Sequence, residues 1–257
     1  MRSVHAAVLV ITVVIGSAAK PADDKHPLSF QERSAIESKF RQVLKDYPQK
    51  SDEAPGSVAH HSRRGDALYF LGRFREAVAE YQAMVRIDPQ QDASHWRLGI
   101  ALFFDDKHSQ AAAQFDKYHV FDDVDRENGI WRFLSHHKAF GAKRAARELL
   151  RYQKDDREPF PVVYRLFDGG VTAEQAVQMI PDELAEVERD KRLFYTQLYV
   201  GMLASVQGDS DAAQSALHAA VSCQWPRGAG FGPNYMWHVA RLEYNRLAAG
   251  RDVPAEP

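Results

Sequence analysis

The sequence predicts an all-α protein in which helical hairpins stack into a right-handed superhelix with N- and C-terminal capping helices. Small residues recur with a period of 34: Ala77, Ala111 and Ala145 are each 34 residues apart, and Ala213 follows after two further periods. A glycine-bearing motif precedes three of these alanines at a constant distance. Recurrence at a fixed period of about 20 to 50 residues is typical of a solenoid, in which each unit buries its apolar face against the next.

The residues around these alanines explain the period physically. The glycine motif reads His61-x2-Arg64-Gly65-x2-Leu68, then His95-x2-Leu98-Gly99-x2-Leu102, then Gln197-x2-Val200-Gly201-x2-Ala204. Four residues after each alanine stands a large side chain: Tyr81, Phe115, Leu149 or Leu217. A glycine lets the first helix of a hairpin approach its partner without a side chain between them. The large residue then fills the space between neighbouring hairpins.

This pattern resembles the tetratricopeptide repeat (TPR), a helical hairpin of about 34 residues that is often closed by a proline, as by Pro89 here. The resemblance divides residues 58–225 into units at 58–91, 92–125, 126–159, 160–193 and 194–225. The unit at 160–193 lacks the signature, so we expect a shortened, degenerate hairpin there. Its turn is predicted at Asp168-Gly169-Gly170, and Thr172 is expected to start a second short helix.

Segments outside the repeats are expected to close the stack. Residues 20–57 are predicted to be a linker and an N-terminal helix, in which Ser29 and Glu32 form a capping box at the start of a helix at 29–47. Residues 226–257 are predicted to be a loop, a C-terminal capping helix and a tail. The glycine-rich segment 225–233 is expected to be the loop, with the helix running from Asn234 to the residue before Gly250.

Residues 1–19 have the pattern of an export signal peptide. Arg2 precedes an uncharged run that reaches Ala19, with an apolar part at residues 6–15 and small residues after it. We expect cleavage after Ala19 and a periplasmic or secreted protein; an uncleaved membrane anchor is the alternative. The cleavage site has no cysteine that could carry a lipid. The single cysteine, Cys223, excludes an intramolecular disulfide and is expected to be buried.

The order of short motifs along the chain is similar to that of the NlpI-type periplasmic TPR lipoproteins. These motifs are residues 130–134 (IWRFL), 163–167 (VYRLF) with the Gly-Gly turn, 194–195 (FY), 199–201 (YVG), 208–209 (GD), 212–213 (AA) and 240–243 (ARLE). The resemblance implies a dimeric envelope adaptor that brings a periplasmic protease and peptidoglycan hydrolases together. The chain departs from the family in lacking the lipid-bearing cysteine.

No pattern of an active site, metal site or cofactor site stands out. The pairs His60-His61 and His136-His137 are adjacent, and adjacent helical residues point about 100° apart, so neither pair offers two ligands to one metal. The acidic segment 122–125 lacks the glycine and the distal glutamate of a calcium loop and is predicted to be a turn. With 33 basic and 35 acidic residues, the chain gives no reason to expect nucleic acid as a partner. We therefore predict a protein without catalytic activity, metal, cofactor or small-molecule substrate.

Other proteins are the expected partners. In a TPR superhelix the first helix of each hairpin lines a concave groove. The predicted groove residues are Tyr69, Phe70, Trp96, Ile100, Phe103, Phe104, Ile130 and His137. Contiguous apolar surface tends to mark an interaction site. Two alternatives remain open: these residues pack in the core, or the helix at 29–47 folds into the groove.

The sequence thus predicts a scaffold that binds other envelope proteins through its concave face, and that forms a homodimer if the family resemblance holds. A structural component of a secretion or pilus-type assembly is the first alternative. A metal-dependent enzyme that uses the histidines is the second.

Overall fold

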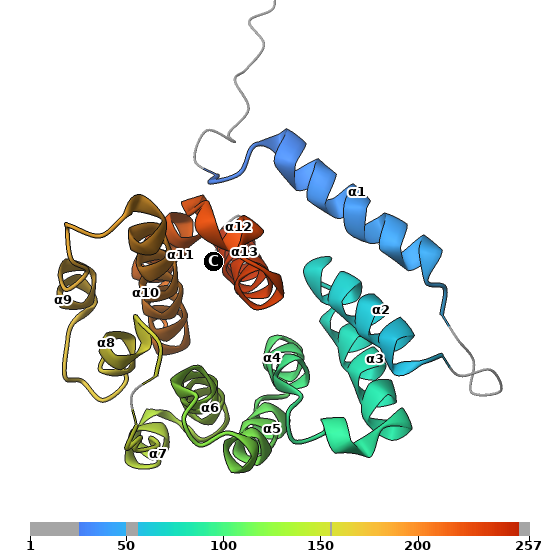
Figure 1. Ribbon diagram of the computed structural model, residues 1–257, viewed down its shortest axis with the longest axis horizontal. Coiled ribbons are helices and arrows are strands. Elements are labelled where there is room, and N and C mark those ends of the chain that lie inside the picture. Colours follow the sequence, from blue (N-terminus) through green and yellow to red (C-terminus); the bar gives the residue numbers. More distant parts are fainter. Residues whose placement is uncertain (1–25, 50–55, 155, 252–257) are drawn as a thin grey trace, which may run out of the picture.

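A computed structural model describes residues 26–49, 56–154 and 156–251, and the predicted signal peptide at 1–19 lies outside these ranges. The described residues form helices and connecting turns, without a strand. Most of these helices pair as antiparallel hairpins that follow one another along an arc (Figure 1). The prediction of an all-α TPR-type solenoid is confirmed. None of the described helices is both long enough and apolar enough to cross a membrane.

Three hairpins contain the predicted repeat signature. They are α2 with α3, α4 with α5, and α10 with α11, and the two helices of each pair pack against each other. Their bounds are α2 (Val58–Phe70), α3 (Phe74–Ile87), α4 (Trp96–Phe104), α5 (His108–Phe121), α10 (Glu186–Gln207) and α11 (Ser210–Ser222). A short 3-10 helix, η1 (Pro89–Gln91), follows α3, so Pro89 closes the first unit as expected. The long α10 starts at Glu186, within the range assigned to the degenerate unit.

The middle of the chain has shorter helices. Helix α6 (Arg126–Phe140) packs on α5, and α7 (Ala142–Arg147) turns back onto α6. Helices α8 (Phe160–Tyr164) and α9 (Ala173–Gln178) make up the degenerate unit. Thr172 and Gln175 form a capping box at the start of α9, which confirms Thr172 as the start signal.

Both terminal segments pack on the repeats. Helix α1 (Phe30–Asp46) begins with the expected capping box of Ser29 and Glu32 and lies on α2. Residues 225–233 were predicted to be a loop, but they contain α12 (Trp225–Gly228) and the start of α13 (Phe231–Arg251). Helix α13 therefore starts before Asn234 and continues past Gly250. It packs on α11 of the last hairpin and also reaches α2 of the first (Figure 1).

The repeat glycines are close-approach positions, as predicted. A β-carbon placed on Gly65 would lie 2.5 Å from Cε1 of Tyr81, and one on Gly99 would lie 2.6 Å from Cζ of Phe115. On Gly201 it would lie 2.6 Å from Cγ of Leu217. In each hairpin the glycine thus faces the large residue that the repeat places on the second helix, and that residue fills the room left by the missing side chain.

Gly99→Ala should lower the free energy of unfolding by about 1–3 kcal/mol, because an added methyl group forces Phe115 to move within a packed core. This cost exceeds the gain of up to about 1 kcal/mol that alanine brings to a helix interior. Gly250→Ala is the matched control, since a β-carbon there meets no atom within 4 Å. Urea unfolding followed by circular dichroism measures both. Equal stability of the two variants would contradict the close-approach role of Gly99.

Candidate functional site

The concave side of the arc is not an open groove. Six of the eight predicted groove residues are buried in the core: Tyr69, Phe70, Ile100, Phe103, Phe104 and Ile130. Only Trp96 and His137 stay partly exposed. The prediction of a solvent-facing aromatic groove is therefore wrong for these six residues. They pack in the core, which was the alternative that the sequence left open.

Helix α13 covers much of this side. The ring of Tyr235 stacks on Tyr69 with 4.9 Å between the ring centres and meets Trp96 edge-on at the same distance. Its hydroxyl lies 3.3 Å from that of Tyr81, the large residue of the first repeat. Farther along, the ring of His238 lies 4.2 Å from that of Phe70. The segment that enters the concave side is thus the C-terminal helix and not the helix at 29–47, which was one of the two alternatives left open by the sequence.

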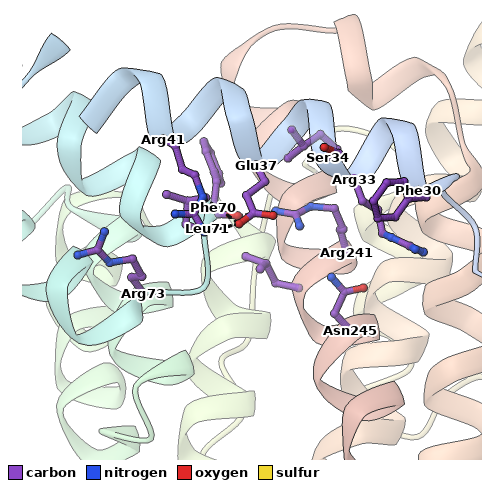
Figure 2. A pocket seen from close by; sticks show the side chains of 12 residues that line it. Phe30, Arg33, Ser34, Glu37, Arg41, Phe70, Leu71, Arg73, Arg241 and Asn245 are labelled. Carbon is purple, nitrogen blue, oxygen red and sulfur yellow. Dashed lines mark hydrogen bonds and ion pairs between the residues drawn. The ribbon is translucent and has the colours of Figure 1, made fainter. Parts of the chain in front are cut away.

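Helix α1 lies across the open edge of the arc and leaves a cleft beneath it. Leu28 is buried at one end, where His26 bonds Asn245 at 3.0 Å. At the other end the ring of Phe40, the one buried residue of α1, lies 4.8 Å from that of Phe70. Between these anchors a cleft of about 610 Å³ separates α1 from α2 and α13 (Figure 2).

Arginines surround an apolar floor in this α1 cleft. Its lining contains Arg33, Arg41, Arg73 and Arg241, together with Glu37, Asn245, Ser34, Phe30, Ile36, Phe70, Leu71 and Leu242. Figure 2 shows Arg33, Glu37 and Arg41 on the side of α1 that faces the cleft, with Arg241 and Asn245 opposite them on α13. Phe30 stands at the edge with 71% of its surface exposed. The cleft therefore combines excess positive charge with apolar surface.

The arginines of the cleft differ in how firmly they are held. Arg41 donates to Glu37 at 2.9 Å, and Arg73 donates to Glu76 at 2.7 Å, with all four side chains about half exposed or more. Exposed pairs of this kind contribute little net free energy, typically about 0–1 kcal/mol, so their arginines can exchange partners. Arg241 is buried, donates to the carbonyl of Phe70 at 2.6 Å, and has its pKa lowered to about 10 by that burial.

A second opening, the rim cavity, lies where α13 meets the inner edge of the repeats. Its volume is about 410 Å³, and it is lined by Trp96, Tyr118, Asp125, Glu127, Arg157, Lys191, Tyr195, Trp225, Gly232, Pro233 and Met236. Trp96 is the predicted groove residue that contributes to it. The other aromatic rings come from α5, α10 and α12, which the sequence pattern did not bring together.

A charged cluster forms one wall of the rim cavity. Arg157 lies 2.6 Å from Glu127, 3.1 Å from Asp156 and 3.6 Å from Asp125. Asp125 also caps α6 by accepting from the amide of Glu127 at 3.0 Å. The pKa of Glu127 is raised to about 7, chiefly by burial and in smaller part by the neighbouring carboxylates of Asp125 and Asp156, while Arg157 acts to lower it. The hydroxyl of Tyr199 donates to Glu127 as well.

The histidine pairs and the acidic segment that the sequence analysis considered make contacts within the fold. His136 is buried beside Glu148, and His61 bonds Glu80. The side chain of Asp122 accepts from the amides of Val124 and Asp125, which confirms the predicted turn. Among the described residues, no three His, Cys, Asp or Glu side chains are placed to share a metal ion. His137 lies partly exposed on α6, 6.1 Å from the ring of Phe133.

Cys223 is buried, as predicted, and its thiol contacts the carbonyl of Ala219. Burial raises the pKa of this thiol, and the carboxylate of Asp190 raises it further. Because the thiolate is the reactive form, this environment suits a packing residue rather than a nucleophile.

A comparison with protein families gives a match. Residues 65–103, from the middle of α2 almost to the end of α4, match a family described as TPR repeat. No curated protein matches the chain. TPR repeats generally mediate interactions between proteins and are generally non-catalytic.

Tyr235→Ala should lower the free energy of unfolding by about 3–5 kcal/mol, because it removes a fully buried ring from between α13 and the repeats. Phe231→Ala, at the exposed start of the same helix, should cost about 1 kcal/mol or less. Thermal unfolding by calorimetry compares them. If Tyr235→Ala were as stable as Phe231→Ala, α13 would not be part of the core.

Glu127→Gln should change how stability depends on pH. Because the pKa of Glu127 is raised from 4.5 to about 7 in the folded chain, the folded state holds a proton that the unfolded state has released between these values. The wild type should therefore lose stability relative to the variant as pH rises from 5 to 8, by up to about 3 kcal/mol. Urea unfolding of both proteins at each pH measures this difference; a pH-independent difference would show that Glu127 titrates normally.

Proposed function

We propose that this protein is a non-catalytic scaffold that binds an acidic amphipathic helix of a partner protein in the α1 cleft. The observation that carries this proposal is the combination of arginines, apolar floor and exposed Phe30 in one cleft between helices. An amphipathic helix binds in such a groove by burying its apolar face, while charges at the groove edge fix its direction and register.

The charges of the cleft favour a carboxylate-bearing partner. Guanidinium groups pair with carboxylates through two parallel hydrogen bonds, which makes arginine suited to recognising acidic side chains. Arg41 and Arg73 bond exposed glutamates of their own helical segments, so a partner's carboxylates can replace those bonds at small cost. Arg241 is held in place by Phe70 and offers a fixed positive charge at the floor.

The apolar part of the cleft supplies the affinity. Ile36, Phe70, Leu71 and Leu242 line it, and Phe30 adds a large exposed ring. Aromatic and arginine residues are the types that most often dominate the binding energy of an interface. A segment that brings both apolar and acidic side chains therefore matches the cleft better than a purely acidic or purely apolar one.

The cell envelope is the proposed location, on the strength of the export-signal pattern in residues 1–19. The similarity of motif order to the NlpI-type family supports a dimeric adaptor whose partners are a protease and peptidoglycan hydrolases. Such an adaptor would act by holding two proteins on one scaffold, which makes their encounter effectively intramolecular.

Charge reversal in the cleft tests the proposal. The full-length protein carries a photo-crosslinking amino acid in place of Phe30, and crosslinked segments from envelope extract are identified by mass spectrometry. The captured segments should be acidic and amphipathic, and synthetic peptides of them should bind. The double variant Arg41→Glu, Arg73→Glu should weaken peptide binding at least tenfold, since every 1.4 kcal/mol is about a factor of ten.

The control is Arg147→Glu with Arg189→Glu, which makes the same change in net charge at exposed positions outside the cleft. It should bind as the wild type does. Two results would show that the α1 cleft is not the site: captured segments that are basic or purely apolar, or equal peptide binding by the two double variants.

A further inference from the structure

The rim cavity has no role in the proposed protein-binding cleft, and its chemistry differs. We infer that it binds an organic cation: a primary ammonium group on an apolar stem, as in a lysine side chain or a free diamine. The inference rests on the aromatic walls, the volume and the charge of the cavity taken together, and it stands independently of the α1 cleft.

Aromatic rings line the cavity on several sides. Trp96 comes from α4, Tyr118 from α5, Tyr195 from α10 and Trp225 from α12. The ring of Trp225 lies 5.9 Å from that of Tyr195, so these two form one continuous wall. The faces of indole and phenol rings attract cations, most strongly where water is excluded. Met236 adds a polarisable apolar contact for a hydrocarbon stem.

The charged wall of the cavity has an excess of negative charge. Three carboxylates, those of Asp125, Glu127 and Asp156, surround the single guanidinium of Arg157. Their net charge with Arg157 is −1 while Glu127, with its pKa of about 7, is protonated, and −2 when all three are ionised. The remaining cation of the lining, Lys191, is paired with Glu188 at 3.2 Å. Glu188 also pairs with Arg192, which in turn pairs with Glu158, so these two cations and two carboxylates balance each other. The excess negative charge therefore stays with the cluster around Arg157, and a bound cation would reduce it.

Asp125 is the carboxylate best placed to meet the ligand. Its side chain lines the cavity with 19% of its surface exposed, and its distance to Arg157 is the longest of the three at 3.6 Å. Burial raises the pKa of Asp125, and the neighbouring Asp156 and Asp122 raise it further, against the lowering by Arg157. A carboxylate accepts hydrogen bonds, so a primary ammonium group with its N–H donors fits better than a quaternary one.

The volume suits a small group. About 410 Å³ lies within the range of about 300–1,000 Å³ that is typical of small-molecule sites. This room holds a lysine side chain with its backbone, or a diamine of similar length, and the carboxylates at one wall would orient its ammonium group.

Titration of the full-length protein with two cations and one neutral analogue tests the inference. The ligands are N-acetyl-lysine methylamide, the diamine cadaverine, and N-acetyl-norleucine methylamide, which has a similar stem without the charge. Calorimetry and tryptophan fluorescence report binding, since Trp96 and Trp225 line the cavity. At least one cation should bind saturably, with a dissociation constant on the order of 1 mM or below, and norleucine should bind at least tenfold more weakly.

Asp125→Asn should weaken the binding of the cation about tenfold. Asparagine also caps helices, so this variant keeps the start of α6 and removes only the charge. Asp209→Asn is the matched control, because Asp209 also caps a helix with its side chain, at the start of α11 and outside the cavity. Trp225→Leu, checked for native helicity and melting, tests the aromatic wall separately and should also weaken binding.

The two cations separate the possible sources. Binding of the lysine derivative alone indicates a protein ligand, binding of cadaverine alone indicates a free amine, and binding of both shows a site for either. Three results would overturn the inference. They are no saturable binding of either cation below about 10 mM, binding of the norleucine analogue as tight as that of the cations, or unchanged cation binding by both Asp125→Asn and Trp225→Leu.

Discussion

The packing of α13 along the concave side is the interaction on which the rest of the structure depends. Tyr235 joins it to the repeats by stacking on Tyr69 and by placing its hydroxyl next to that of Tyr81. Tyr81 is itself the large residue that fills the room left by Gly65. The hairpin packing of the first repeat therefore also positions the surface on which the C-terminal helix packs. Because α13 contacts both α2 and α11, it connects the first and the last hairpin of the arc.

Because α13 covers the concave side, the two openings described above lie along the edges of this helix. Arg241, Leu242 and Asn245 form the wall of the α1 cleft opposite α1, while Pro233 and Met236 form part of the rim cavity. One helix thus separates two openings of opposite charge. The α1 cleft carries excess arginine, and the rim cavity carries excess carboxylate, so the two would select ligands of opposite charge without competing.

The sequence analysis did not predict the α1 cleft, and Phe70 is the only residue of its lining that was among the predicted groove residues. Arg33, Glu37 and Arg41 are four residues apart, which places them on one face of a helix and was readable from the sequence. Nothing in the local pattern shows that this face lies opposite Arg241, about two hundred residues away along the chain. The same holds for the rim cavity, where Trp96 was identified but Trp225 and Tyr195 were not placed beside it.

The sequence by itself determined the hairpins, the order of most helices and the close approach at Gly65, Gly99 and Gly201, because these follow from contacts within about 34 residues that repeat along the chain. Only the tertiary structure decided which side of the repeats is covered. Tyr81 and Tyr235 meet across 154 residues, and an aromatic residue on a helix has the same sequence pattern whether it faces solvent, a partner or another segment of its own chain. Its burial depends on where that distant segment packs, which periodicity does not encode.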